Sequence, residues 1–539
     1  MSIAPAELVV GRSSLLRRLA ATAANATARD WAGSLAVTAA GGVVRFYRLT
    51  TPRSLVSDEF YYVPDAYGIL RHGAEVNHSP DAPTLLLHGR TNILATGGEF
   101  VAHPPLGKVM IAAGEWLFGL TPFGWRFAAA VVGTLAILMT ARIARRMTGS
   151  ALLGCLAGLL LAADGLELVM SRTAMLDIFL MFWTLASFGC LVIDRDKWLA
   201  RLAALPGEPA LPGEPGLPGE PGLPGEPGLP GEPGQLPRGI RWWRVLAGVC
   251  VGLACATKWD ALWYIPAFAC LAIAWDVTAI GRAGFDRPAR RALISAAKWV
   301  PVSFVVAPAL AYLASYSGWF ASTVGYDRNW AALHGNHVPI WSALDSFYHD
   351  TRDMLHYGLG LMGSPQSPPW TWLTLTRPMT FYFSPARVCT GSHCSQQSVQ
   401  QILAIGTPLI WWAAIPALLA CLAWWLTTRD WRAGAVVLCV LAGWLPWIWF
   451  SWHGNRIVYF FYAVAFDPFL VIAITLCLGW LISRASRASR AWRRAGVALT
   501  VTYVVAVVAD FAFMYPVLTA VRLSESAWLA RMWLPGWRL

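Results

Sequence analysis

Long apolar stretches recur along the chain, and they constrain its fold more than any other feature. Stretches of about 17–22 residues lie at 31–49, 126–145, 150–168, 175–193, 243–258, 260–276, 298–315, 405–426, 433–450, 457–480 and 496–515. Of all residues, 56% are hydrophobic and only 13% are charged. Inside a bilayer every backbone amide must find its hydrogen bond within the protein. The pattern therefore predicts an all-α polytopic membrane protein with about 11 transmembrane helices.

Basic residues gather between the apolar stretches, and their positions predict the orientation. The clusters are Arg142, Arg145 and Arg146; Arg195, Lys197 and Arg201; Arg282, Arg287, Arg290, Arg291 and Lys298; Arg429 and Arg432; and Arg484, Arg487, Arg490, Arg493 and Arg494. Under the positive-inside rule all of them face the cytoplasm, together with the basic tail 1–30, and the C-terminus is extracytoplasmic. The tail lacks the compact apolar core of a signal peptide. These clusters account for the net charge of +12. A nucleic-acid partner is not predicted, because no basic stretch is interleaved with stacking aromatics in a soluble region.

One further apolar stretch, 103–120, does not fit as a span. If it crossed the membrane, the cluster at Arg142–Arg146 would lie outside. The stretch is short and contains Lys108 and Glu115. It is therefore predicted to be an amphipathic or re-entrant helix at the outer surface, within a first extracytoplasmic loop over 50–125.

With this orientation, unusual polar residues gather on the outer face. They are Asp58 and Glu59, His103 to Lys108, Arg126, "SRTAMLD" (171–177), "TKWD" (257–260), a long loop over 316–404 and "SWHGNR" (451–456). Polar groups at membrane depth are costly and mark functional sites. Their position on one face predicts a site at the membrane–water boundary. A transporter would place such groups nearer the midplane and would show an inverted internal repeat.

Two segments stand apart from this pattern. A cytoplasmic loop over 194–242 contains a Pro/Gly-rich six-residue repeat at 205–234, which predicts an extended polyproline-like spacer rather than a collagen triple helix, because the latter needs three chains. In the loop 316–404, Cys389 and Cys394 are close in sequence, and a local disulfide is expected if that loop is extracytoplasmic. A metal pair is less favoured, since only His393 accompanies them.

Several collinear motifs resemble a known family. "SDEFYY", "HPPLGK", "GWR", "SRTAMLDIF", "TKWDALWYIP", "SPPWTWLTLTRPMTFYF" and "YFFYAVAFDPFLVI" resemble the bacterial, and especially actinobacterial, protein O-mannosyltransferases. These are similar to the catalytic core of the eukaryotic dolichyl-phosphate-mannose–protein mannosyltransferases. The resemblance runs from about residue 40 to the C-terminus. It implies a C-type glycosyltransferase (GT-C) fold over 31–539, whereas the repeat at 205–234 lies outside the family pattern.

The resemblance also implies an activity. A mannosyltransferase of this kind would move mannose from polyprenyl-phosphate-mannose to Ser or Thr hydroxyls of secreted proteins, at the outer face of the bacterial plasma membrane and with inversion. The rival interpretation is a polyprenyl-phosphate-sugar transferase that acts on a glycolipid or cell-wall glycan. The expected partners are the lipid-linked donor, secreted acceptors and membrane lipids, and the Sec translocon is a candidate.

Mapped onto the family motifs, a small set of residues carries the chemistry. Asp58 is the candidate general base, and Glu59 is expected to orient the acceptor or to bond a sugar hydroxyl. Lys108, Arg126 and Arg456 are candidate phosphate contacts. Further candidate substrate contacts are His103, Arg172, Asp177, Lys258, Trp370 and Arg377. For Arg172 the alternative is an ion pair with Asp177 or Asp164, and Trp370 could equally be an interfacial anchor.

The same reasoning assigns no cofactor. The leaving phosphate needs charge stabilisation rather than a general acid, and a serine hydroxyl needs a base. No Asp-x-Asp motif lies near the first loop, so a divalent metal is not inferred, although it is not ruled out either.

Overall fold

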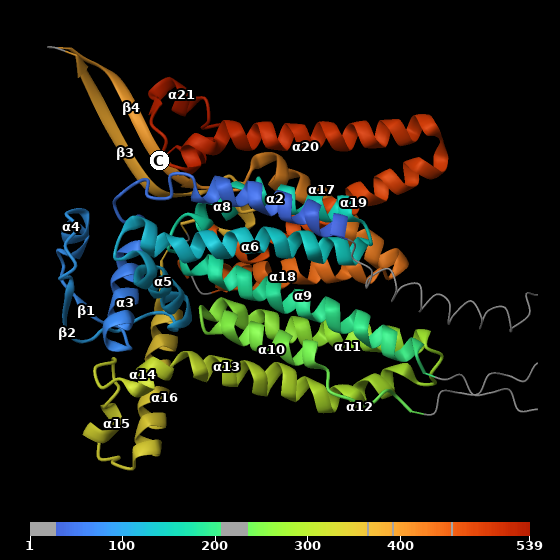
Figure 1. The fold of residues 1–539 in the computed structure, drawn as a ribbon, viewed down its shortest axis with the longest axis horizontal. Coiled ribbons are helices and arrows are strands. Elements are labelled where there is room, and N and C mark those ends of the chain that lie inside the picture. The colour runs from blue at the N-terminus through green and yellow to red at the C-terminus, as the bar shows by residue number, and fades with distance from the viewer. Residues whose placement is uncertain (1–27, 206–234, 364–365, 391–392, 454–455, 539) are drawn as a thin grey trace, which may run out of the picture.

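The computed structural model describes residues 28–205, 235–363, 366–390, 393–453 and 456–538. Long helices run side by side as a bundle, and shorter helices and strands cover one of its ends (Figure 1). The bundle consists of α2 (Ala28–Phe46), α6 (Pro122–Thr148), α7 (Ala151–Ala162), α8 (Gly165–Ser171), α9 (Leu176–Ala203), α10 (Trp242–Cys255), η1 (Trp259–Trp263), α11 (Tyr264–Arg282), α12 (Pro288–Pro301), η2 (Val302–Val306), α13 (Ala307–Ser315), α17 (Pro408–Thr428), α18 (Trp431–His453), η4 (Phe460–Phe466), α19 (Asp467–Ala488) and α20 (Arg490–Leu518).

The predicted apolar stretches all fall on helices. In the described part of the chain, eight helices are long and apolar enough to cross a membrane, and the number is nine if α7 and α8, bent by 67°, form one span. The helix α10 has only 14 residues, and α2 is not in this set. A multi-pass membrane protein is therefore confirmed, whereas eleven crossings and the positions of the termini stay predictions.

The covered end is formed by the first loop, by the loop 316–404 and by the C-terminal segment. The first loop forms α3 (Glu59–His72), β1 (Val76–His78), α4 (Ala82–Leu87), β2 (Leu94–Gly98) and α5 (Leu106–Phe118). Later segments form α14 (Ser317–Ala321), α15 (Trp330–Leu333), α16 (Pro339–Gly360), η3 (Pro369–Thr371), β3 (Met379–Thr390), β4 (His393–Ala404), β5 (Leu523–Ser524), α21 (Glu525–Leu529) and η5 (Pro535–Trp537). Turns such as α11–α12 and α19–α20, where basic clusters lie, are at the opposite end (Figure 1). We call the covered end the outer end, following the predicted orientation.

The surface helix expected over 103–120 is present as α5. It packs against α3 and α6 and is not among the candidate spans. Its two charged side chains face the protein, with Lys108 1% and Glu115 2% exposed. The apolar residues Trp116, Leu117 and Phe118 are exposed instead, as is typical of a helix that lies at a membrane surface.

The loop 316–404 is more ordered than its polar sequence indicates. It contains the 22-residue helix α16 and a hairpin in which β3 pairs antiparallel with β4. β1 and β2 form a second, two-stranded sheet, and β5 adds to the edge of β4. The all-α prediction thus holds for the bundle but not for its outer end. The register places Cys389 opposite Cys394, whose side chains lie outside the described part, so their disulfide stays a prediction.

An ion-pair clamp joins three helices at the inner end. Arg241 and Arg244 each contact both Asp194 of α9 and Asp276 of α11, at N–O distances of 2.6–3.1 Å. All four residues are buried, and buried charges are stable only when they are paired. The cytoplasmic loop predicted over 194–242 is therefore shorter than expected, because α9 continues through Asp194 to Ala203. The repeat at 205–234 lies, except for Leu205, outside the described residues.

Candidate active site

The adjacent carboxylates Asp58 and Glu59 lie at the start of α3, where the backbone turns sharply. Ser57 has a φ of 48°, a left-handed conformation that non-glycine residues adopt rarely. The amide of Glu59 donates to the carbonyl of Val56 at 3.0 Å and closes the turn. Asp58 is half-buried whereas Glu59 is fully buried. The turn therefore gives two neighbouring acids different surroundings.

Glu59 is held on all sides by hydrogen-bond donors. Its Oε1 accepts from Nε of Arg126 at 2.8 Å and from the amide of Ala174 at 3.0 Å. Its Oε2 accepts from Nη2 of Arg126 at 2.8 Å and from the amide of Val56 at 3.0 Å. With both oxygens occupied and no exposed surface, Glu59 has no free acceptor for a substrate. The expected contact with the acceptor or a sugar hydroxyl does not fit this geometry.

The hydrogen-bond donors of Arg126 are also all taken by groups of the protein. Besides Glu59, its guanidinium donates to the carbonyls of Leu49, Pro52 and Ser54 at 2.7–3.3 Å. The side chain is fully buried. A guanidinium has five donors, and here they go to Glu59 at the start of α3 and to carbonyls of the segment between α2 and α3. Arg126 thus fastens the turn that carries Asp58, and the expected phosphate contact does not fit.

Asp58 faces a group of aromatic and charged side chains. Tyr62, one turn further along α3, donates from its hydroxyl to Oδ2 of Asp58 at 3.4 Å. Burial raises the pKa of Asp58 above the usual 3.8, while the charge of Lys258 and the Tyr62 hydrogen bond partly offset that rise. The carboxylate is thus made a stronger base than a solvated aspartate, which suits proton abstraction.

Lys258 lies in the segment between α10 and η1 and is nearly inaccessible. Its Nζ is 2.9 Å from Oδ1 of Asp177 and 3.6 Å from Oδ2 of Asp260, and it lies 4.0 Å from the centre of the Tyr462 ring. Asp177 and Lys258, both predicted as site residues, are thus brought together as a buried ion pair. The ammonium of Lys258 acts on Asp58 and favours its ionised form.

His103 completes this side of the site. Its ring centre is 6.2 Å from that of Tyr62. Burial, together with the charges of Lys258, Lys108 and Arg456, holds the pKa of His103 well below its usual range. The imidazole is therefore neutral at physiological pH, so it can exchange a hydrogen bond with a hydroxyl but cannot act as a cation.

Lys108, a predicted phosphate contact, is used inside the protein. Its Nζ is 2.6 Å from Oε1 of Glu75 and 3.7 Å from Oδ2 of Asp65, and it donates to the carbonyl of His103 at 3.1 Å. The side chain is 1% exposed. Lys108 therefore links α5 to α3 and to the "HPP" segment, and the phosphate role does not fit.

Arg172 also differs from both of its expected roles. It donates to the carbonyls of Val44, Arg45, Tyr47 and Arg48 at 2.6–3.2 Å. These carbonyls lie at and just beyond the end of α2, where helical acceptors are left without partners. Arg172 caps α2, while Asp177 pairs with Lys258 and Asp164 caps α8.

Of the three predicted phosphate contacts, Arg456 is the one that retains free donors in the described structure. Its Nε donates to the carbonyl of Gly358 at 2.9 Å, and its guanidinium lies 5.0 Å from the Trp447 ring. Among the described residues no partner contacts its two Nη atoms, and the side chain is half-buried. The charge of Arg456 acts on His103, so the cation lies on the same side of the site.

Trp370 and Arg377 lie further along the loop 316–404. Both are exposed, and no contact in the described structure joins either to Asp58 or Lys258. Sequence reasoning missed Tyr62 and Tyr462, although Tyr62 follows Asp58 by four residues, the spacing at which helical side chains are neighbours.

Comparisons with known proteins show what the chain is similar to. A family model described as dolichyl-phosphate-mannose-protein mannosyltransferase matches residues 35–201. Two proteins named polyprenol-phosphate-mannose–protein mannosyltransferase, from Mycolicibacterium smegmatis and Mycobacterium tuberculosis, are each 36% identical to this chain. The alignments cover 95% of it and 93% and 92% of those relatives, respectively. A relative of the same name from Corynebacterium glutamicum is 33% identical over 92% of this chain and 91% of its own length.

Among solved structures, a chain of the Saccharomyces cerevisiae protein O-mannosyltransferase Pmt1–Pmt2 complex bound to the sugar donor matches with a TM-score of 0.70. The match covers 96% of this chain and 94% of that one, at 12% sequence identity. So low an identity shows the fold alone, which is the GT-C fold predicted from the motifs.

Proposed function

This chain belongs to the dolichyl-phosphate-mannose–protein mannosyltransferase family, and on that premise we propose that it transfers mannose from polyprenyl-phosphate-mannose to Ser or Thr hydroxyls of secreted proteins. The support for the activity is the identity of 33–36% to proteins of that name over nearly the whole chain. The observation that carries the mechanism is the half-buried Asp58, whose carboxylate lies beside Lys258 and Tyr62 rather than in a closed ion pair.

The reaction is a single displacement. The acceptor hydroxyl oxygen attacks C1 of mannose while Asp58 takes its proton, and the bond from C1 to the phosphate oxygen breaks, releasing polyprenyl phosphate. Attack opposite the leaving group inverts the anomeric centre. A general base contributes about 10²–10⁴-fold to such a step, and the leaving phosphate needs a nearby cation to stabilise its charge.

The residues around Asp58 take supporting roles. The charge of Lys258 favours the ionised form of Asp58 and offsets part of the cost of its burial, while Asp177 holds Lys258 in place. Neutral His103 exchanges a hydrogen bond with a hydroxyl of the sugar or the acceptor. Arg456 binds the donor phosphate, since its two Nη atoms have no partner in the described structure. Trp370 and Arg377 stay candidate contacts for the acceptor, and their support is that both are exposed in the loop 316–404.

Oriented membrane vesicles test both the activity and the side of the membrane on which the active site lies. Right-side-out vesicles that contain the donor lipid should mannosylate a membrane-impermeant peptide with Ser and Thr, detected as a hexose mass increase on those residues. Sealed inside-out vesicles should do so only after permeabilisation. If the peptide stays unmodified while a glycolipid gains the sugar, the protein-directed activity is wrong. Mannosylation in sealed inside-out vesicles would instead show that the site faces the cytoplasm.

The variant Arg456→Ala should raise the apparent KM for the donor by about 10–100-fold. A hydrogen bond to a charged group contributes roughly 1.5–3 kcal/mol, which corresponds to that range. The measurement is the rate of mannose transfer at increasing donor concentration. Arg352→Ala removes an exposed charge on α16 and is the matched control for the loss of positive charge. If both variants leave the donor KM unchanged, Arg456 does not hold the phosphate, and Arg377 is next to be tested.

A further inference from the structure

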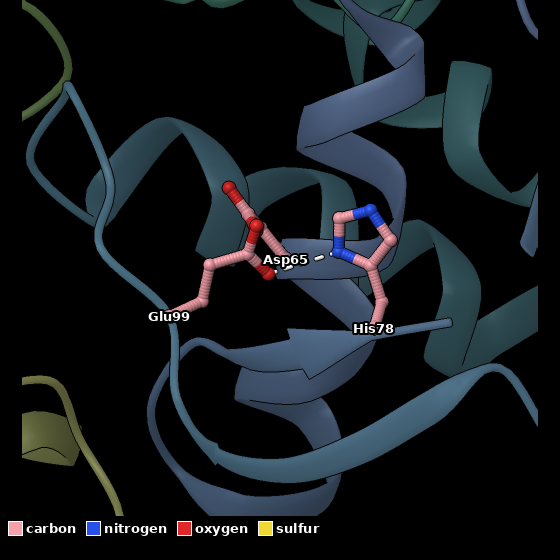
Figure 2. A group of neighbouring side chains, drawn as sticks. All are labelled: Asp65, His78 and Glu99. Atoms are coloured by element: carbon pink, nitrogen blue, oxygen red, sulfur yellow. Dashed lines mark hydrogen bonds and ion pairs between the residues drawn. The ribbon is translucent and has the colours of Figure 1, made fainter. Parts of the chain in front are cut away.

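Three side chains with metal-binding chemistry meet in the first outer loop, apart from the Asp58 cluster. Asp65 comes from α3, His78 from the end of β1, and Glu99 directly follows β2 (Figure 2). One ligand atom from each lies within 4.8 Å of the other two, and Nδ1 of His78 is 2.9 Å from Oε2 of Glu99. The carboxylates and the imidazole lie against one another (Figure 2), as the ligands of a common ion do.

Asp65 supplies an independent sign that a ligand is needed. The residue is only 4% exposed, and its buried Oδ1 has no hydrogen-bond partner among the described residues. Its Oδ2 is 3.7 Å from Nζ of Lys108, which lies closer to Glu75, at 2.6 Å. A buried carboxylate oxygen without a donor is strongly unfavourable. A cation at the cluster would satisfy that oxygen.

The local charge also favours a cation. Asp65, Glu75 and Glu99 supply three carboxylates, and Lys108 is the ammonium among them. We propose that Asp65, His78 and Glu99 bind one divalent transition-metal ion, Zn²⁺ or Mn²⁺. An imidazole with two carboxylates suits these ions, whereas Ca²⁺ and Mg²⁺ prefer oxygen ligands alone. Zinc bonds of about 2.0–2.2 Å place tetrahedral ligand atoms about 3.4 Å apart. The ligand atoms, now within 4.8 Å of one another, would therefore approach by at most about 1.4 Å, while Nδ1 of His78 and Oε2 of Glu99, now 2.9 Å apart, would separate slightly.

The ion has a structural task. It ties together α3, the β1–β2 sheet and the segment that leads into α5. The part of the loop between Gly73 and Glu99 has few buried apolar side chains, among them Ala82, Leu86 and Ile93. Small units with so little core are commonly stabilised by a metal. Asp58 lies two turns before Asp65 on the same helix, so the ion also steadies the helix that carries the base.

A second cluster, Asp327, His349 and Asp353, provides the control. Its ligand atoms are equally close, and Nδ1 of His349 is 2.9 Å from Oδ2 of Asp327, as Nδ1 of His78 is from Oε2 of Glu99. The difference is burial, because Asp65 is buried whereas none of the three residues of the second cluster is. It shows no buried oxygen in need of a partner, so we assign no ion to it.

Metal content and thermal stability test the proposal on the purified full-length protein in detergent. After chelator treatment, the protein is equilibrated with zinc or manganese chloride, desalted, and measured by mass spectrometry of the metal. The wild type should retain about one ion per chain and gain melting temperature, because an ion that binds only the folded state stabilises it. Glu99→Gln keeps the size of the side chain, and both it and His78→Ala should weaken binding by at least about tenfold.

The control variant His349→Ala should retain the ion. The proposal is overturned if the wild type keeps no stoichiometric ion and gains no melting temperature with either metal. It is equally overturned if His349→Ala loses the ion while His78→Ala keeps it. Elution of Glu99→Gln as a single wild-type-like peak in size exclusion separates lost binding from failed folding.

Discussion

Replacing Asp58 by Asn should lower the rate of mannose transfer by about 10²–10⁴-fold, the usual contribution of a general base. The amide keeps the size of the side chain and can still bond to Tyr62, but it cannot accept the proton of the acceptor hydroxyl. Binding of the lipid-linked donor should change little, since Asp58 acts on the acceptor. The measurement is the transfer rate at saturating donor, with donor affinity determined separately.

Asp81→Asn is the matched control, because it makes the same change at an exposed carboxylate of the same loop and should leave the rate unchanged. The wild-type rate should also fall as the pH drops through the raised pKa of Asp58, at higher pH than for an ordinary aspartate, because only the ionised form is a base. A variant Asp58→Asn with a normal rate would contradict the assignment. So would one that folds normally but no longer binds the donor.

Replacing the neighbouring Glu59 by Gln should act on folding instead of chemistry. Breaking a buried ion pair by neutralising one partner leaves the other charge unpaired and costs about 3–5 kcal/mol. Here the amide would also put a donor where Glu59 now accepts from Arg126, Ala174 and Val56. We expect a much lower melting temperature and a poor yield of folded protein, measured by thermal scanning in detergent.

The double variant Glu59→Gln with Arg126→Gln shows whether the lost stability comes from the ion pair between these two residues. Residues that share an interaction give non-additive changes, so the double variant should lose less stability than the two single variants added together. A Glu59→Gln protein with a wild-type melting temperature and a reduced rate would instead return Glu59 to the catalytic role that its place beside Asp58 first indicated.

The sequence predicted the bundle well, because the distance across a membrane dictates the length and apolarity of each span. It also named residues that the structure brings near one another, among them Asp58, Asp177 and Lys258, although their roles stay a proposal. The hairpin β3–β4 was missed, because β4 is mostly polar before its last three residues and shows no alternation of apolar and polar residues, so the aromatic start of β3 had no recognisable partner strand.

The roles of individual charges were harder to predict than their positions. Arg126 and Lys108 were expected to bind phosphate, and Arg172 was expected to contact substrate or to pair with Asp177 or Asp164. In the structure each is balanced by partners far away in sequence, as in Arg126 with Glu59, 67 residues apart. An isolated sequence shows that a buried cation needs an anion or a set of carbonyls, but only the fold shows whether substrate or protein supplies them.

The ion-pair clamp at the inner end has a consequence for how this protein can change over time. Asp194 and Asp276 hold Arg241 and Arg244 in place, so α9 and α10 are anchored to each other by side chains on both sides of the repeat. The length of the connection is then nearly irrelevant to helix placement, since even a doubling adds only about 0.6 kcal/mol of closure entropy. We therefore expect the loss of whole six-residue units from the repeat to leave the placement of α9 and α10 unchanged.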